Sequence, residues 1–291
     1  MPYLSESPSL SESAFSILRD LIHEHLGLYY ADDRREILQD RLAPLVVERG
    51  SQSFLDYYYL LKYDPLAGVE WLRVQSALAV RETYFWREYD QLRAVTEVLI
   101  PRWKQTHPAE PFRIWHAACA SGEEPYSMAI TLQENGTPAI NTFNIIASDF
   151  DQVSLEKARQ GIYTERSFRT LPPEIREKYF HPVENGSTQL AETIIKQVQL
   201  KYINLMDDEA MQTMRAMDVI FCRNVFIYFS DKVIKHVAHN LYRSLKPGGY
   251  LCLGAAESLL RITTPFDLVE VNKTFMYQFL RQFAQMATGC A

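Results

Sequence analysis

The sequence predicts a doubly wound α/β fold, with a small all-helical domain before it and a small β-subdomain inserted into it. Strand-like apolar stretches alternate with helical patterns from residue 112 onward, which is typical of a parallel sheet. Residues 12–78 show only the helical spacing of apolar side chains. Residues 162–196 interrupt the alternation and are too long for a simple connection, so they are predicted to form the insertion.

Four helices are predicted in the N-terminal domain, residues 1–78, because apolar residues recur there every three or four positions. Small polar residues typical of helix N-caps precede two of them, and glycines typical of helix ends follow two. In order, the helices are expected to begin after Ser11 or Ser13 and end at Gly27, to reach Gly50, to begin after Ser53, and to cover about 65–78.

Residues 79–108 are interpreted as a linker that contributes to the active site, and residues 109–291 as the sheet domain. Asn185-Gly186 within the insertion is a hairpin signal. The remaining expected strands are 112–118, 143–148, 197–203, 217–222 and 250–254, with helices from Glu123, at 153–160 and at 231–245, and a final antiparallel hairpin of 266–271 and 274–279.

The composition is that of an ordinary globular protein, with 291 residues, 47% hydrophobic and 23% charged. The formal net charge of −6 argues against broad binding of nucleic acid or of anionic membranes, which needs a basic surface. The N-terminus lacks the features of a signal peptide, and no apolar run reaches the ~20 residues of a membrane span. We therefore expect a cytoplasmic protein that does not insert into membranes and does not bind nucleic acid.

The four cysteines give no metal-binding pattern, since no two have CxxC spacing and no histidine cluster accompanies them. No metal site is predicted. Buried reduced thiols are expected instead, consistent with a reducing compartment.

The segment 117–127, Ala-Ala-Cys-Ala-Ser-Gly-Glu-Glu-Pro-Tyr-Ser, joins the first predicted strand of the sheet to a helix. Its small residues would let a ligand approach the backbone closely, although one glycine in place of three is a weak dinucleotide fingerprint. Glu123 and Glu124 would repel a pyrophosphate but suit a cation, such as the sulfonium and ammonium groups of S-adenosylmethionine. Alternatively, both carboxylates only complement the helix dipole.

Asp149 ends the second strand of the predicted sheet, where an acidic residue commonly accepts hydrogen bonds from ribose hydroxyls. The alternative is that it caps the following helix. Because Asp151 is the better cap candidate, the ribose is assigned to Asp149.

The segment 223–228, which includes the polar residues Arg223, Asn224 and Tyr228, directly follows the strand at 217–222. It is expected at the carboxyl edge of the sheet, where open α/β sheets bind ligands. Taken alone, Tyr228 would be a core aromatic residue. Residues 81–88, Arg-Glu-Thr-Tyr-Phe-Trp-Arg-Glu, taken alone would be an amphipathic segment with solvated charges.

Together, these four motifs resemble the CheR-type chemotaxis receptor methyltransferases over about residues 12–280. The most specific combination is Gly-Glu-Glu-Pro-Tyr-Ser at 122–127 with Cys-Arg-Asn at 222–224 and Ile-Tyr-Phe at 227–229. Ala-Ser-Asp-Phe-Asp at 147–151 and Lys-Pro-Gly-Gly at 246–249 also match. The resemblance implies a Rossmann-like S-adenosylmethionine-dependent methyltransferase sheet.

The resemblance also implies roles for individual residues, with S-adenosylmethionine as cofactor and S-adenosylhomocysteine as product. Because a positive side chain would hold the substrate carboxylate, our hypothesis gives this task to Arg87, with Tyr228 orienting the oxygen or the methyl donor. The cofactor-binding residues implied are Thr83 and Arg87, Glu123 (with Glu124 as the alternative) at the methionine end, Asp149 at the ribose, Asn204 and Leu205 at the adenine, and Arg223, Asn224 and Tyr228 at the reaction centre.

The implied activity is methylation of glutamate side chains on the cytoplasmic domain of methyl-accepting chemotaxis receptors, giving glutamate 5-O-methyl esters for adaptation in chemotaxis-type signalling. The insertion at 162–196 resembles a β-subdomain that in some members tethers a peptide from the receptor C-terminus.

The sequence departs from the family pattern in three respects. Arg81 stands where the family usually has asparagine, and Trp86 replaces a phenylalanine. The predicted helix within 32–49 lacks the positive charge that the family often presents to the receptor.

Three other functions would each explain part of the sequence. A nicotinamide-dependent reductase would explain Asp149 but not the glutamate pair or the missing glycines. A sensor that binds S-adenosylmethionine without turnover is disfavoured by the presence of Arg87 and Tyr228. A DNA-binding role for residues 12–78 is disfavoured by their acidic charge balance.

Overall fold

The computed structural model describes residues 8–136 and 142–279, which fold into two compact units. The N-terminal unit extends to Val80 and also includes Tyr228–Ser230. The larger unit comprises Arg81–Ile227 and the described residues from Asp231 onward.

The N-terminal unit is built of the four predicted helices. The N-cap hydroxyls of Ser11 and Ser53 accept hydrogen bonds from the first turns of two helices, and Gly27 ends the first helix in the left-handed conformation. Leu18, Leu42 and similar residues form its buried core. The helices are α1 (Glu12–Leu26), α2 (Arg35–Glu48), α3 (Phe54–Tyr63) and α4 (Ala67–Leu78), with a short 3-10 turn η1 (Asp32–Arg34) before α2.

The predicted linker is largely helical, which the sequence analysis did not anticipate. Helix α5 (Tyr89–Ala94) continues through a π-helical turn η2 (Val95–Leu99) into α6 (Ile100–Thr106). The π turn shifts the register of the buried face, so the apolar residues do not keep one helical period over the whole stretch.

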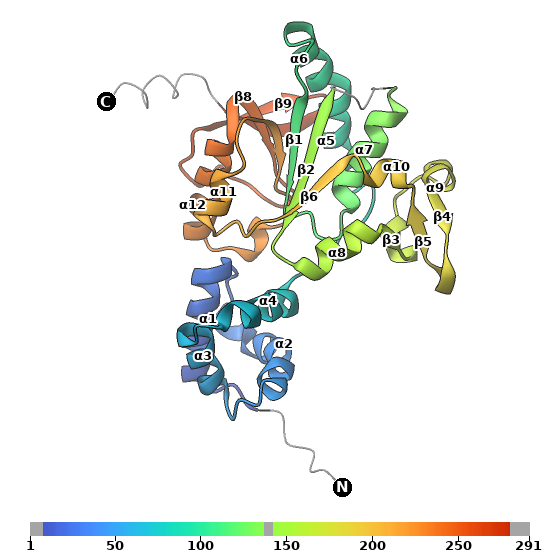
Figure 1. The fold of residues 1–291 in the computed structure, drawn as a ribbon. Coiled ribbons are helices and arrows are strands. Elements are labelled where there is room, and N and C mark those ends of the chain that lie inside the picture. Colours follow the sequence, from blue (N-terminus) through green and yellow to red (C-terminus); the bar gives the residue numbers. More distant parts are fainter. Residues whose placement is uncertain (1–7, 137–141, 280–291) are drawn as a thin grey trace. The chain divides into compact units, whose positions relative to one another are not determined.

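The sheet of the larger unit has seven strands in the order β6-β2-β1-β7-β8-β10-β9 (Figure 1). The first five strands in this order pair in parallel, and β10 pairs antiparallel with both β8 and β9. The predicted doubly wound sheet with an antiparallel edge hairpin is therefore confirmed. The strands are β1 (Phe112–Ala117), β2 (Phe143–Asp149), β6 (Val198–Tyr202), β7 (Met217–Phe221), β8 (Leu245–Cys252), β9 (Phe266–Val271) and β10 (Thr274–Phe279).

Helices cover both faces of this sheet, as Figure 1 shows, with α5, α7 and α8 on one side and α11 and α12 on the other. Parallel pairing brings the carboxyl ends of β1, β2, β6 and β7 to one edge, so the loops that follow these strands lie together. The connecting helices are α7 (Glu123–Glu134), α8 (Gln152–Gln160), α11 (Asp208–Gln212) and α12 (Asp231–Ser244).

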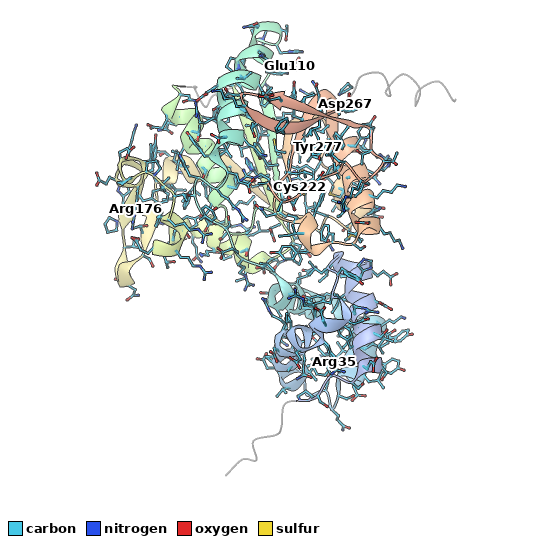
Figure 2. The ribbon with its side chains drawn as sticks, turned by 180° about the vertical axis from the view of Figure 1, so that it is seen from behind. Arg35, Glu110, Arg176, Cys222, Asp267 and Tyr277 are labelled. Carbon is cyan, nitrogen blue, oxygen red and sulfur yellow. The ribbon has the colours of Figure 1, made fainter. Side chains whose placement is uncertain are left out.

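The inserted subdomain folds around a second sheet of order β3-β5-β4, so the predicted β-subdomain is confirmed. Asn185 and Gly186 both have positive φ between β4 and β5, as the hairpin signal predicts. Figure 2 shows Arg176 on this subdomain. Its elements are β3 (Ile162–Tyr163), η3 (Glu165–Phe168), α9 (Pro173–Tyr179), β4 (Phe180–Pro182), η4 (Glu184–Gly186), β5 (Thr188–Leu190) and α10 (Glu192–Ile195).

Strand β8 differs most from its predicted bounds, whereas the other predicted strands differ by at most one residue at either end. Strand β8 begins at Leu245, because Leu245 already pairs with Met217 and the residues up to Gly249 form an irregularity before regular pairing resumes at Tyr250. The described cysteines are buried free thiols, and Figure 2 shows Cys222 inside the sheet domain. Among the described residues, no helix is long and apolar enough to span a membrane.

Candidate active site

The loop after β1 folds tightly against the sheet edge. Ala118, Ala120 and Gly122 all have positive φ, and Gly122 reaches +92°. A Cβ at Gly122 would lie 2.7 Å from Cε2 of Tyr126, so only glycine fits there. The small residues predicted for close approach of a ligand are therefore also required by the backbone.

The two glutamates that begin α7 lie in different environments. Glu123 is 1% exposed and accepts hydrogen bonds from the hydroxyls of Ser121 (2.7 Å) and Ser167 (3.0 Å). Burial raises the pKa of its carboxyl group. Glu123 thus joins the β1 loop to the inserted subdomain.

Glu124 faces the ends of β1 and β7. Its carboxylate receives a hydrogen bond at 2.7 Å from Nδ1 of His116 and lies 3.3 Å from Nε of Arg223. Burial opposes its ionisation, but the Arg223 charge and the His116 contact outweigh burial and lower the pKa of Glu124. The lowered pKa favours the ionised form of Glu124 at the sheet edge, whereas the sequence-based prediction gave the methionine end to Glu123, with Glu124 as the alternative.

Asp149 ends β2 beside the β1 loop. Its carboxylate accepts hydrogen bonds from the backbone N–H groups of Ala120 and Asp151, both at 2.8 Å. Burial raises the pKa of Asp149 to about 6. Asp151 caps α8 through Val153 and Ser154, as the sequence predicts, which leaves Asp149 free of the capping role.

Asn204 and Leu205 lie directly after β6, the neighbour of β2. The backbone N–H of Ile203 donates to the carbonyl of Asp149 at 3.0 Å, which fixes this turn beside the β2 end. The Asn204 side chain accepts from the N–H of Met206, and Leu205 is buried. Both residues are therefore positioned at the same edge as Asp149.

Arg223 follows β7 and is the buried cation of the site. One Nη donates to the carbonyl of Arg87 at 2.6 Å and lies 3.5 Å from the Glu88 carboxylate. Within the described chain, Nη1 is buried without a hydrogen-bond partner. An unpartnered buried guanidinium N–H is costly, so this atom is available to donate to a bound anionic group.

Glu257, which is not among the predicted site residues, organises the loop after β7. Its carboxylate accepts four backbone N–H donors, each at 2.7 Å, from Asn224, Val225, Phe226 and Gly254. Asn224 needs this support because its φ is +60°. No signal in the sequence near 257 marked this role, because the donors lie more than 30 positions earlier, except for Gly254.

The 81–88 segment crosses the sheet edge and is fixed along its length. Phe85 donates its N–H to the carbonyl of Ser167 at 2.9 Å, and Trp86 donates its N–H to the hydroxyl of Ser127 at 3.1 Å. Phe85 also stacks on Phe168 with ring centres 5.6 Å apart. The segment is therefore held by both α7 and the inserted subdomain.

Charged residues pin the start of the segment. Nε of Arg81 lies 2.7 Å from the Asp151 carboxylate, so the departure from asparagine creates an ion pair with the α8 cap. Glu82 pairs with Arg166 (2.8 Å) and Arg169 (2.6 Å), and their charges lower its pKa.

Thr83 and Arg87 lie half-buried on this segment. The Arg87 guanidinium donates to the carbonyl of Glu82 at 2.9 Å and lies 5.5 Å from the centre of the Tyr84 ring. Its charge also contributes to the lowered pKa of Glu124, which places it near that carboxylate.

Tyr228 belongs to the N-terminal unit. Its carbonyl accepts a hydrogen bond at 2.8 Å from the N–H of Tyr29, next to an isolated β-bridge between Leu28 and Phe229. The other predicted residues lie in the larger unit, so the role of Tyr228 at the reaction centre stays a prediction.

Comparisons with known proteins cover both units. A family model described as CheR methyltransferase, SAM binding domain, matches residues 81–275. A second, described as CheR methyltransferase, all-alpha domain, matches residues 13–78. The two matches together span most of the chain.

Curated relatives agree with these matches. Chemotaxis protein methyltransferase 2 of Vibrio cholerae serotype O1 is 37% identical over 270 residues, covering 92% of this chain and 93% of the relative. The chemotaxis protein methyltransferase of Vibrio parahaemolyticus is 32% identical, covering 93% and 98%. That of Salmonella typhimurium is 30% identical, covering 91% and 90%.

Proposed function

Because the chain belongs to the CheR methyltransferase family, we propose that it methylates glutamate side chains on the cytoplasmic domain of chemoreceptors. The products are glutamate 5-O-methyl esters and S-adenosylhomocysteine, and the reaction takes place in the cytoplasm. The family establishes a methyltransferase that binds S-adenosylmethionine and takes part in chemotaxis; the acceptor group is what we propose.

The residues present fit S-adenosylmethionine. The Asp149 carboxylate accepts hydrogen bonds from backbone N–H groups and retains acceptor capacity for ribose hydroxyls. The ionised Glu124 suits the ammonium group, and the unpartnered Nη1 of Arg223 suits a carboxylate. We assign the adenine to Asn204 and Leu205, and the methionine end to Glu124 in preference to Glu123.

When bound, the cofactor supplies an electrophilic methyl group on a sulfonium. A glutamate side chain has an ordinary pKa of about 4.3, so it is ionised at neutral pH and needs no general base. The work left to the protein is to hold the carboxylate in line with the methyl group and to exclude water.

Arg87 is the residue we assign to the substrate carboxylate, with Thr83 beside it on the same segment and Asn224 across the sheet edge. Its guanidinium lies half-buried near Glu124, and its carbonyl is held by Arg223 at 2.6 Å. A guanidinium can grip both carboxylate oxygens in one plane. Tyr228 is retained as the residue that orients the reacting oxygen.

The observation that carries the proposal is the buried cluster of Arg223, Glu124 and the Arg87 backbone at the carboxyl ends of β1 and β7. This cluster provides a carboxylate and a guanidinium for the charged groups of the cofactor, and it fixes the backbone of Arg87, whose guanidinium is assigned to the acceptor. A reductase on the same sheet would have no use for this combination.

Replacing Arg87 tests the proposal. The Arg87→Ala variant should lose about 100-fold in kcat for methylation of a receptor cytoplasmic domain, because the acceptor is no longer held in line. Its affinity for S-adenosylhomocysteine, measured by calorimetry, should change less than about threefold. Arg159→Ala, which removes a guanidinium from the exposed face of α8, is the matched control. Near-normal turnover by Arg87→Ala would remove Arg87 from the mechanism.

The inserted subdomain supports a second contact with the receptor. Strand β4 is an edge strand of the β3-β5-β4 sheet, and a peptide from the receptor C-terminus could add to it. Deleting 162–196 would also remove Ser167, which holds Glu123 and Phe85, so a point variant is the better probe. His181 pairs with Gln189 of β5, so the side-chain variant His181→Glu, which keeps this backbone pairing, should weaken calorimetric binding of the receptor C-terminal peptide and leave S-adenosylhomocysteine binding unchanged. Absence of binding by the wild-type protein would refute the tether.

A further inference from the structure

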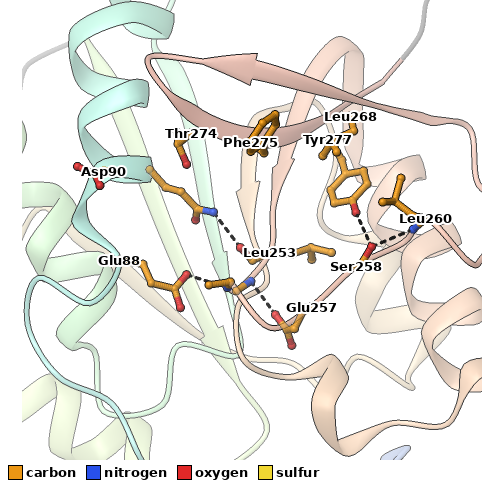
Figure 3. A pocket seen from close by; sticks show the side chains of 13 residues that line it. Glu88, Asp90, Leu253, Glu257, Ser258, Leu260, Leu268, Thr274, Phe275 and Tyr277 are labelled. Atoms are coloured by element: carbon orange, nitrogen blue, oxygen red, sulfur yellow. Dashed lines mark hydrogen bonds between the residues drawn. The ribbon is translucent and has the colours of Figure 1, made fainter.

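A cavity of about 480 Å³ opens beside the candidate active site, between the start of α5 and the β9–β10 hairpin (Figure 3). Its floor is the turn after β8, and its upper wall comes from Thr274 and Phe275 of β10. The volume is in the range of small-molecule and side-chain sites. None of the residues assigned to the cofactor lines it.

The charged side chains that line this cavity are all carboxylates. Glu88, Asp90 and Glu257 line it, and no lysine, arginine or histidine of the described chain is among its lining residues. Arg93 approaches Asp90 only to 4.0 Å, from outside the lining. The cavity therefore favours a cation.

Gln91 gives independent support. It is 8% exposed, and its Nε2 donates to the carbonyl of Leu253 at 2.9 Å. Its Oε1 is buried and has no hydrogen-bond partner in the described chain. A buried amide oxygen without a donor is costly, so a ligand that brings an N–H group would relieve that cost.

Apolar, exposed side chains form another part of the cavity wall. Leu260 is 73% exposed and Phe275 60%, and Leu268 is also exposed. Figure 3 shows Phe275 and Leu268 on the hairpin facing the turn that carries Glu257 and Ser258. An apolar surface next to acidic acceptors suits a basic side chain whose stem and neighbours are aliphatic.

Two contacts join the cavity to the candidate active site. The Glu88 carboxylate accepts from the N–H of Ala255 at 3.2 Å and lies 3.5 Å from Nη of Arg223. Glu257 lines the cavity and also holds Asn224. A group bound here would therefore lie beside carboxylates that contact Arg223 and Asn224.

We propose that this cavity binds a lysine or arginine side chain of the protein substrate, close to the glutamate that is methylated. The basic group pairs with Asp90 and Glu88 and donates to Oε1 of Gln91, while neighbouring aliphatic substrate side chains pack on Phe275 and Leu268. The identity of the substrate in this inference rests on the proposed function. The basic chemistry of the bound group does not.

The ligand chemistry is tested without any methylation. N-acetylarginine methylamide serves as the probe, with the uncharged citrulline analogue as control, in a titration followed by the NMR methyl signals of Leu260 and Leu268. The arginine probe should shift these signals and the citrulline probe should shift them much less, and Asp90→Asn should weaken the arginine shift. Equal shifts from both probes, or none, would overturn the proposal, whatever the acceptor of the methyl group.

The substrate role is tested with Asp90→Lys and a receptor cytoplasmic domain. Asp90 is 82% exposed, so the variant should fold. KM for the receptor domain should rise about tenfold with kcat nearly unchanged, and S-adenosylhomocysteine affinity should stay the same. Asp267→Lys is the matched control, because it reverses a charge on β9 next to Leu268 but outside the cavity lining.

The partner residue is found by replacing each lysine and arginine near the methylated glutamate of the receptor. One replacement should raise KM with the wild-type protein but have no further effect with Asp90→Asn, which removes the charge without adding an opposite one. If every replacement adds independently to Asp90→Asn, the cavity does not bind the substrate. If the arginine probe binds but no glutamate of any receptor is methylated, the proposed function fails and the substrate role of the cavity fails with it.

Discussion

The loops after β1 and β7 lie at neighbouring strand ends but are held in different ways. In the β1 loop, the hydrogen bonds are spread over several partners: Gly122 donates to the carbonyl of Cys119 within the loop, and Ala120 donates to Asp149 on the next strand. In the β7 loop, one carboxylate from Glu257 accepts three successive N–H groups that begin 33 positions earlier in the chain.

This difference explains why the two loops differ in how readily they are predicted. The β1 loop shows its conformation in its own composition, because small residues stand where φ is positive. The β7 loop carries an informative Arg223-Asn224 pair, but its conformation is set by a residue outside any motif. We therefore expect the β7 loop to lose its conformation when Glu257 is replaced. The β1 loop should lose its conformation when its own residues are replaced.

Glu257→Gln should have the largest effect, since an amide cannot accept all four N–H donors and brings two donors of its own. We expect about 100-fold loss in kcat, because Arg223 and Asn224 move. The free energy of unfolding, from urea titration, should fall by about 3 kcal/mol. Glu270→Gln on exposed β9 is the control. Normal kcat with lowered stability would mean that Glu257 supports the fold but not the reaction.

Gly122→Ala should give the next largest effect, on cofactor affinity. Its φ of +92° and the Tyr126 contact at 2.7 Å force the β1 loop to shift. Affinity for S-adenosylhomocysteine, by calorimetry, should fall about 30-fold, equivalent to about 2 kcal/mol. Gly136→Ala also has positive φ, at +65°, but meets nothing within 4 Å, so it should leave affinity unchanged. Equal effects from both variants would contradict the role of close packing.

The pH dependence of cofactor affinity should reveal Asp149. Because its pKa is raised to about 6, its carboxyl group gains a proton as the pH falls through 6, and the ionised acceptor for the ribose is lost. Calorimetric affinity for S-adenosylhomocysteine should therefore fall about tenfold from pH 7 to pH 5. Asp149→Asn should bind weakly with little dependence on pH over this range. A wild-type affinity that stays constant from pH 7 to pH 5 would remove Asp149 from the ribose site.

Arg81→Asn, which restores the usual family residue, should have the smallest effect. The Arg81 side chain is 42% exposed in its pair with Asp151, so its loss should cost less than about 1 kcal/mol in unfolding free energy. Cofactor affinity should change less than about threefold. A larger gain in affinity would show that Arg81 hinders the site.

Much of the fold could be predicted because its signals are local. Ser11, Ser53 and Asp151 cap helices as their sequence contexts indicate, and Asn185-Gly186 turns a hairpin. The helices of 89–106 were missed because the π turn breaks their period. The strand bounds failed at Leu245, where an irregular pairing replaces a simple turn.

The residues of the candidate site could be predicted from the sequence better than the contacts between them. The motifs indicated Glu123 and Glu124, but not that Ser121 and Ser167 enclose the first while His116 and Arg223 face the second. Such contacts join separate parts of the chain, and a single sequence carries no local sign of them. Glu257 and Gln91 were missed for the same reason.

The most direct test of the account is to locate the transferred methyl group. The purified protein is incubated with S-adenosylmethionine and a receptor cytoplasmic domain, and the receptor peptides are analysed by mass spectrometry before and after mild alkali. We expect methyl groups on glutamate side chains that alkali releases as methanol, and none on receptors whose target glutamates are replaced by alanine. Methyl groups that resist alkali, or that appear on another residue type, would contradict glutamate esterification.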